Sequence, residues 1–229
     1  HKAFGPDETC AEFFKYLSSN YEDYSIRQAL LAILNYCWEN DTVPDSFNAA
    51  NVFSLFKKGD ATDPKNYRPI ALLNVMCKIY TKIIRARLAV LDPFIRETQY
   101  GFRKNRSTQQ PLFAIRRLMD YLESSQEKGA ILFLDWEKAF DKVDQERMLE
   151  ALHRMGVPEK MCKVIGAIYE NPRFVVKDKF STSTSRSQNA GIRQGCPLSP
   201  YLFVILLSTV FEDIHTVSYT HLRAHETRR

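Results

Sequence analysis

The sequence contains no run of eighteen or more apolar residues, which is about the length that a helix needs to cross a bilayer. Its first ten residues, HKAFGPDETC, have no initiator Met and no charged segment followed by an apolar stretch, so they do not resemble a secretion signal. We therefore expect a soluble chain, without a membrane partner, that starts inside a longer protein.

The cysteines do not form the spacing of a disulfide framework or a zinc knuckle. There are five, an odd number, and no two of them make a C-x-x-C pair. We expect a reducing, intracellular setting. Because 45% of the 229 residues are hydrophobic, the chain can bury a sizeable core as one large domain or two small ones.

Positive charge is concentrated in one part of the chain. Residues 51–118 contain fourteen Lys and Arg against four acidic residues, a local charge of +10 within a chain whose total is +5. Lys and Arg favour polyanions because they displace counterions from phosphates. A polyanion-facing surface and ordinary solvated helix faces both remain open on charge alone.

Apolar periodicity predicts a mixture of helices and strands, and hence an α+β fold with a basic front part and a mixed back part. Asp144 is the predicted N-cap of one helix. Helices are expected near residues 12–17, 26–37, 74–91, 108–125, 145–155, 159–170 and 201–214, and strands or extended segments near 51–56, 65–73, 131–134 and 173–180.

The segment ILFLDWEKAFDKV, residues 131–143, carries the first chemical signal. Four apolar residues predict a buried strand that ends at Asp135. A carboxylate at a strand end is held rigidly and can bind a hard divalent cation. The alternative is that Asp135 only caps or solvates the strand end.

Two further segments contain groups suited to phosphates. GIRQGCPLSPYLF, residues 191–203, has two glycines that allow a ligand close to the backbone, with Arg193 and Gln194 as donors. KNYRPI holds Arg68 in an extended segment, since Pro69 disfavours helix before it. Arg68, with Lys57 and Lys58 nearby in sequence, can meet a triphosphate.

Together these blocks resemble the reverse transcriptases of LINE-type (non-LTR) retrotransposons. Six blocks match in order over about residues 2–207, and their common register makes the resemblance specific. The blocks are KAFGPDE, NVFSLFKKGD, DPKNYRPIALL, QYGFRKNRST, ILFLDWEKAFDKV and GIRQGCPLSPYLF.

The resemblance implies a right-hand polymerase, with fingers in residues 1–129 and a partial palm in 130–214. It implies an RNA template, a DNA primer or nicked target DNA, and deoxynucleoside triphosphates as substrates. Asp135 would be a catalytic ligand of two Mg²⁺ ions. Synthesis on chromosomal DNA would imply the nucleus of a eukaryote.

The resemblance also implies individual roles near the nucleotide. Phe140 corresponds to an aromatic steric gate that excludes a ribose 2′-hydroxyl, although a purely apolar role stays open. Gln194 and Gly195 would lie beneath the nucleotide. The other implied contacts are triphosphate contacts from the backbone of Lys138 and Ala139 and from Lys57, Lys58 and Arg68, and template contacts from Arg103, Lys104 and Arg106.

The chain departs from the family pattern after residue 214. The family has a second motif with two adjacent aspartates, and this sequence contains no Asp-Asp pair. Residues 215–229 resemble a translated sequencing-adapter string, so we expect a non-native tail, and His221 with His225 lacks an evident third metal ligand. With Asp135 alone, we expect weak metal binding and little or no polymerisation by this fragment.

Three alternatives remain open. A group II intron maturase shares the RPI, aromatic-gate and QG blocks. A degenerate reverse transcriptase could persist as a non-catalytic RNA-binding module. A phosphotransferase with Asp135 as nucleophile and Glu137 two residues later lacks a glycine-rich phosphate cradle.

Overall fold

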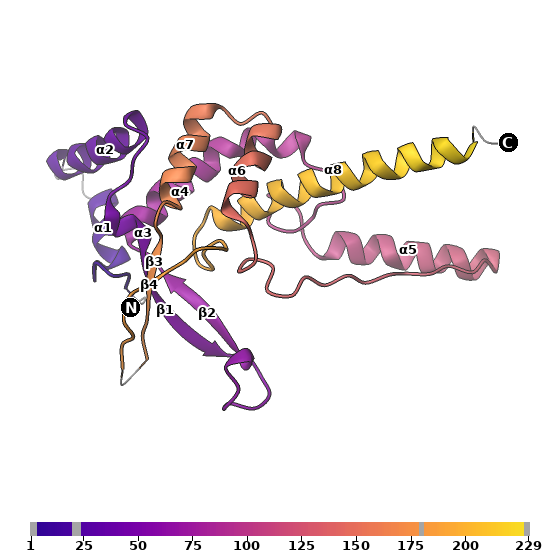
Figure 1. The fold of residues 1–229 in the computed structure, drawn as a ribbon, viewed down its shortest axis with the longest axis horizontal. Coiled ribbons are helices and arrows are strands. Elements are labelled where there is room, and N and C mark those ends of the chain that lie inside the picture. The colour runs from indigo at the N-terminus through magenta and orange to yellow at the C-terminus, as the bar shows by residue number, and fades with distance from the viewer. Residues whose placement is uncertain (1–3, 20–23, 179–180, 227–229) are drawn as a thin grey trace.

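The computed structural model describes residues 4–19, 24–178 and 181–226, with backbone alone for 17–19, 24 and 215–226. It confirms the α+β class (Figure 1). The helices are α1 (Ala11–Ser19), α2 (Tyr24–Glu39), α3 (Asp45–Asn48), α4 (Val75–Leu88), α5 (Gln109–Ser125), α6 (Gln145–Arg154), α7 (Glu159–Ile168) and α8 (Ser199–Glu226), with 3₁₀ turns η1 (Pro64–Asn66) and η2 (Ala89–Phe94); the strands are β1 (Ala49–Phe56), β2 (Tyr67–Leu72), β3 (Arg173–Val176) and β4 (Arg186–Ser187).

The four strands form one sheet in the order β2-β1-β3-β4. β1 and β2 are antiparallel, with Phe56 opposite Tyr67, whereas β1 and β3 are parallel, with Ala49 opposite Arg173. The sheet therefore joins strands from both sides of residue 129, where the sequence predicts the boundary between fingers and palm. That boundary stays a prediction.

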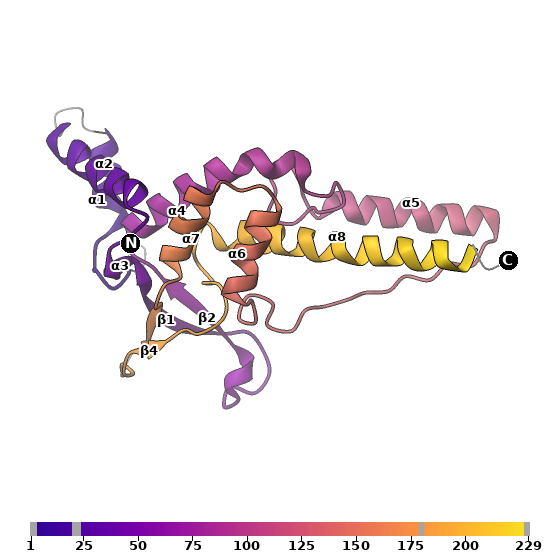
Figure 2. The same ribbon diagram turned by 45° about the horizontal axis from the view of Figure 1, so that its top comes forward.

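The core lies where α4, α6, α7 and α8 meet beside the sheet (Figures 1 and 2). Leu152, Ile165 and Leu202 are fully buried there, one from each of the last three helices. Asp144 caps α6 as predicted, because its side chain accepts a hydrogen bond from the N–H of Arg147 at 3.0 Å. We call these helices and the sheet the body of the protein. Apolar contacts between helices hold the body together.

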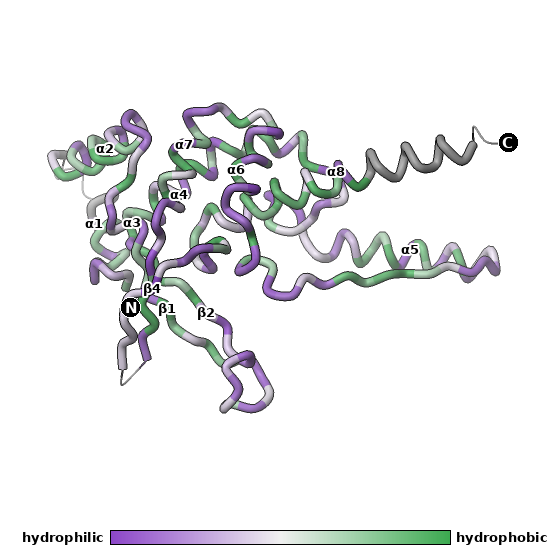
Figure 3. The backbone as a smooth tube through the Cα atoms, viewed as in Figure 1, coloured by the Kyte–Doolittle hydropathy of each residue, from purple (hydrophilic) through white to green (hydrophobic). Residues whose placement is uncertain are grey.

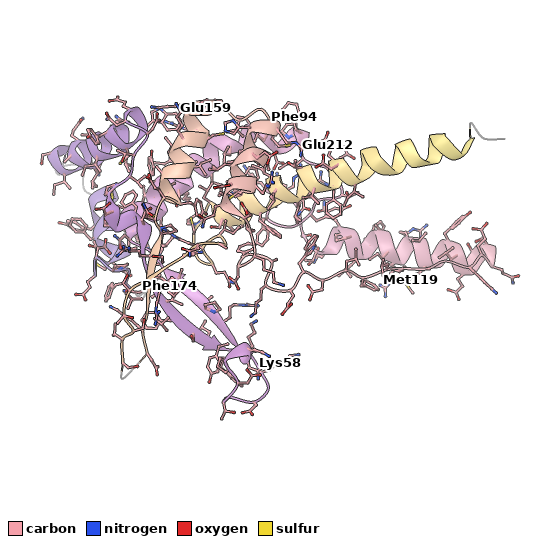
Figure 4. The ribbon with its side chains drawn as sticks, viewed as in Figure 1. Lys58, Phe94, Met119, Glu159, Phe174 and Glu212 are labelled. Atoms are coloured by element: carbon pink, nitrogen blue, oxygen red, sulfur yellow. The ribbon has the colours of Figure 1, made fainter. Side chains whose placement is uncertain are left out.

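A second region projects from this body. α5 leads away from it, and residues 126–136 turn at the end of the helix and run back (Figures 1 and 2). We call α5 with residues 126–136 the arm. None of the α5 residues is buried, and Met119, which is labelled in Figure 4, is 57% exposed.

The predicted strand at 131–134 is wrong. No strand is assigned there, and the side chains of Leu132, Phe133 and Leu134 are 76–80% exposed. Figure 3 shows this apolar stretch along the returning part of the arm. A strand requires a partner for its N–H and C=O groups, and among the described residues none pairs with this segment.

Two predicted helices differ in detail. Of the expected inner face of the 74–91 helix, Leu88 is buried but Ile83 is exposed, and Tyr80 and Ile84 are buried instead. α8 continues past the predicted end at residue 214 to Glu226. His221 and His225 fall where no side chains are described. Within the described residues, no helix is both long and apolar enough to span a membrane.

Candidate active site

The loop of residues 190–196 is seated directly against the end of the hairpin formed by β1 and β2. The backbone oxygen of Gln194 accepts a hydrogen bond from the N–H of Ala71 at 2.8 Å. Gly195 has φ +125°, and a Cβ at this position would lie 2.4 Å from the Ala71 carbonyl oxygen. Only glycine fits this close approach, so the second glycine of GIRQG, residues 191–195, has a structural reason.

The segment after Asp135 contacts the same loop from the other side. The N–H of Ile192 donates to the Phe140 carbonyl at 2.8 Å, and Gln194 Nε2 donates to Asp141 Oδ1 at 3.0 Å. A Cβ on Gly191 would lie 2.8 Å from the Asp141 carbonyl oxygen. Residues 140–141, Gln194 and β2 therefore meet at one place.

The Phe140 side chain is half-buried between two other aromatic rings. Its centroid lies 5.2 Å from that of Phe203 on α8 and 6.2 Å from that of Phe102, with interplanar angles of 50° and 47°. Such tilted pairs are favourable arrangements of aromatic rings. The ring of Phe140 is thus packed between residues from two other blocks.

A pocket of about 210 Å³ lies beside this meeting point. It is lined by Val52, Pro69 and Ala71 of the hairpin, Phe174 of β3, and Asp141 with Gln194. Its wall is mainly apolar with a few polar groups, as is usual for small-molecule sites.

The three predicted triphosphate cations lie outside this pocket. Lys58 is near the tip of the hairpin in Figure 4, and Lys57 beside it is exposed. Arg68 pairs with Leu55 across the hairpin and alternates with Pro69, so its side chain is on the face opposite the pocket. The structure brings Gln194 and Phe140 together but not these cations with them.

Arg193 is a buried residue whose role the sequence did not reveal. It is 3% exposed, and its guanidinium donates to the carbonyls of Phe47 at 2.7 Å and Asn48 at 3.0 Å, with a longer contact of 3.4 Å to Ile168. These carbonyls end α3 and α7, where the helix dipole favours a cation. Arg193 anchors the loop rather than presenting a donor to a ligand.

Arg103 has a structural environment that differs from the predicted template contact. Its side chain is 5% exposed and makes a forked contact to Asp92, with the shortest N–O distance 3.0 Å. It also donates to the carbonyls of Arg96 and Gln99. Its donors are therefore engaged within the protein, whereas Lys104 is exposed.

The remaining predicted residues differ in accessibility. Arg106 is half-buried and lies over the ring of Tyr100, 5.8 Å from its centroid. Among the described residues, no acceptor pairs with the N–H of Lys138 or Ala139. The predicted triphosphate contact of these amides stays a prediction. Asp135 is exposed on the unpaired arm segment rather than at a sheet edge.

Burial shifts two titratable groups close to the core. It raises the pKa of the Cys77 thiol to about 12, and it also raises the pKa of Tyr201 to about 12, with Asp92 adding to the shift. Both groups are protonated at neutral pH, so Cys77 does not supply a thiolate nucleophile. All five cysteines are free thiols.

Comparison with known families identifies the family to which the chain belongs. Residues 56–223 match the family described as reverse transcriptase (RNA-dependent DNA polymerase). The chain belongs to the reverse transcriptase family. The match contains the hairpin end, Phe140 and the Gln194 loop, and it ends within the predicted non-native tail, whose origin stays a prediction.

Proteins of non-LTR elements are among the relatives of this chain. It is 29% identical over 90% of its length to the transposon TX1 uncharacterized 149 kDa protein of Xenopus laevis. It is 28% identical over 79% of its length to the RNA-directed DNA polymerase from mobile element jockey of Drosophila melanogaster, and 28% over 72% to a type-1 R2 retrotransposable element polyprotein of Popillia japonica. It spans only 16%, 20% and 23% of these three relatives.

The described residues do not form a metal centre. No three His, Cys, Asp or Glu side chains converge within the described residues. Asp141, the carboxylate nearest Phe140, is engaged by Gln194. Since Mg²⁺ requires several oxygen ligands in a fixed geometry, Asp135 and its described neighbours do not suffice.

Proposed function

We propose that this chain binds the incoming deoxynucleoside triphosphate during RNA-directed DNA synthesis by a retroelement protein. The observation that carries the proposal is the convergence of Ala71, Phe140 with Asp141, and Gln194. These residues come from three blocks that are far apart in sequence, and they meet beside a pocket. The jockey relative is itself named an RNA-directed DNA polymerase.

Each group near the pocket has a role in this proposal. Phe140 excludes the ribose 2′-hydroxyl, and Gln194 with Gly195 supports the nucleotide from below. The unpaired amides of Lys138 and Ala139 donate to the triphosphate. Lys57, Lys58 and Arg68 lie outside the pocket, so we keep them as phosphate contacts only for a triphosphate that extends beyond the pocket to the hairpin face that Arg68 shares with Leu55.

The RNA template and DNA primer would run along exposed basic groups. Lys104 and Arg106 are retained as template contacts, but Arg103 is not, because its guanidinium is engaged by Asp92 and backbone carbonyls. Synthesis on chromosomal DNA would place the protein in the nucleus. The names of the matched relatives favour a retrotransposon over an intron maturase.

Asp135 supplies one carboxylate of the proposed catalytic centre. In the two-metal chemistry of polymerases, paired ions stabilise the attacking and leaving oxygens of the phosphoryl transfer. Most of the ligands for such a pair have to come from outside the described residues. On its own, this chain should therefore bind Mg²⁺ weakly and polymerise little or not at all.

The proposal is tested by extending a DNA primer on an RNA template with the full-length element protein. We expect DNA synthesis by the unaltered protein, its loss in Asp135→Asn, and increased ribonucleotide incorporation in Phe140→Ala. Unchanged sugar selectivity in Phe140→Ala would contradict the gate. RNA binding without any synthesis would instead support the non-catalytic module.

A further inference from the structure

The aromatic ring of Phe102 contacts Phe140 from the loop of residues 99–106. The two centroids are 6.2 Å apart, and Phe203 packs on Phe140 at 5.2 Å. The backbone of Phe140 is fixed separately, by the hydrogen bond from Ile192 and by the close approach of Gly191. What remains adjustable in Phe140 is the direction of its ring, and the two neighbouring rings determine it.

The backbone of Phe102 is in a conformation that an aromatic residue rarely adopts. Its φ is +61°, in the left-handed region, and its side chain is largely exposed. A bulky residue persists there only where the surroundings hold it. Because the Phe102 side chain is largely exposed, burial of this side chain does not explain why the backbone keeps the left-handed conformation.

Two arginines hold the loop on either side of this ring. Arg85 of α4 donates to the Phe102 carbonyl at 3.3 Å. The next residue, Arg103, is fixed by its fork to Asp92 and by the carbonyls of Arg96 and Gln99. A forked guanidinium–carboxylate contact specifies direction as well as attraction, so the loop position is well defined.

We infer that Phe102 is a positioning residue that sets the sugar selectivity of this site through Phe140, with Arg103 and Asp92 as its anchor. The inference rests on the proposed role of Phe140 as the gate against ribonucleotides. Loss of the Phe102 ring leaves Phe140 supported on one side by Phe203, and its ring can then turn away from the sugar.

The test compares kcat/KM for single deoxyribonucleotide and ribonucleotide incorporation by the full-length protein on an RNA template. An aromatic pair of this kind corresponds to about a 2- to 12-fold change, so we expect Phe102→Ala to reduce discrimination by that factor. Phe102→Tyr retains the ring and should restore it. Phe94→Ala is the matched control, because Phe94 is 75% exposed on η2 and labelled on the outer surface in Figure 4.

A double variant separates action through Phe140 from a general effect. Phe102→Ala should change nothing further in a Phe140→Ala background, since coupled residues are not additive. An equal effect in both backgrounds, or none in the unaltered one, overturns the positioning role. If Phe140→Ala itself leaves the discrimination between deoxyribonucleotides and ribonucleotides unchanged, the proposed role of Phe140 as a gate is contradicted as well.

A second measurement requires no turnover. Nuclear Overhauser effects between the ring protons of Phe102 and Phe140 should be present in phenylalanine-labelled protein and weaken in Arg103→Lys, which lacks the fork. Absence of these contacts in the unaltered protein, or their full retention in Arg103→Lys while the fork to Asp92 is lost, would overturn the inference.

Discussion

The body and the arm both contain many apolar residues, but apolar side chains that are buried in the body are exposed in the arm. Met148 and Leu152 of α6 are buried against neighbouring helices, whereas Leu112 and Phe113 of α5 are largely exposed. The difference lies in the partners, because α6 packs against both α7 and α8, while no described element covers the outer face of α5. An apolar pattern predicts which face of a helix can be buried. Burial also requires another element that packs against this face.

The same contrast divides the candidate site. Phe140 and Gln194 are fixed by the body through hydrogen bonds and ring contacts. Asp135, five residues before Phe140, belongs to the arm and lacks a hydrogen-bond partner among the described residues. The part of the site proposed to face the nucleotide is therefore organised by hydrogen bonds and ring contacts of the described chain, whereas Asp135, the proposed metal ligand, is not held by such contacts.

The largest expected difference between body and arm is in amide hydrogen exchange. Amides of residues 131–134 have no ladder partner and should exchange nearly as fast as in an unfolded peptide. Those in the middle of α6 should be slower by more than about a thousandfold, because their exchange requires opening of the core. Mass spectrometry of short peptides measures both, and comparable protection in the two segments would break the comparison.

A matched pair of arginine substitutions sharpens the comparison. Arg193→Met removes the donors to the Phe47 and Asn48 carbonyls and should lower the free energy of unfolding by about 3 kcal/mol. Arg116→Met, on the exposed arm, should change it by less than about 0.5 kcal/mol. Urea unfolding gives both values; equal losses would show that burial of Arg193 does not stabilise the body.

The smallest expected effect is a pH dependence at the ion pair of Arg154 and Asp213, which links α6 to α8. The hydrogen bond from Arg154 lowers the pKa of Asp213 below its ordinary 3.8. The unfolded chain then takes up the proton first, so this contribution is present above about pH 4 and disappears as the pH falls through the lower folded value.

Asp213→Asn should therefore flatten the acid end of a plot of melting temperature against pH. The pair is exposed, so the change should be slight and should shrink further in high salt. An identical acid limb in the variant would mean that the pair does not contribute.

Helices and their caps were predictable because their determinants are local. The N-cap at Asp144 and the helix expected from about residue 201, which begins at Ser199 as α8, follow from neighbouring residues alone. The segment at 131–134 was mispredicted because a strand depends on a partner that is distant in sequence. Its β-like composition indicates only that it suits a sheet.

Some close packing at the site coincides with the family motifs. Ile192 and Gln194 contact residues 140–141, and the close approach of Gly195 to Ala71 gives the second glycine of GIRQG a physical reason, while the nucleotide roles of these residues stay a prediction. Arg103 and Arg193 were not predictable, since nothing in a sequence distinguishes an arginine that binds backbone carbonyls from one that binds phosphate. The ring contact of Phe102 with Phe140 joins residues from two separate blocks and required the fold.

The most direct test of the account is photocrosslinking with an azido-substituted deoxynucleoside triphosphate, followed by peptide mapping. Binding at the meeting point of β2, Phe140 and Gln194 predicts label on the peptides that contain residues 139–141 and 191–195, removed by excess unmodified deoxynucleotide. Label concentrated on the arm, or label that excess deoxynucleotide does not remove, would contradict it.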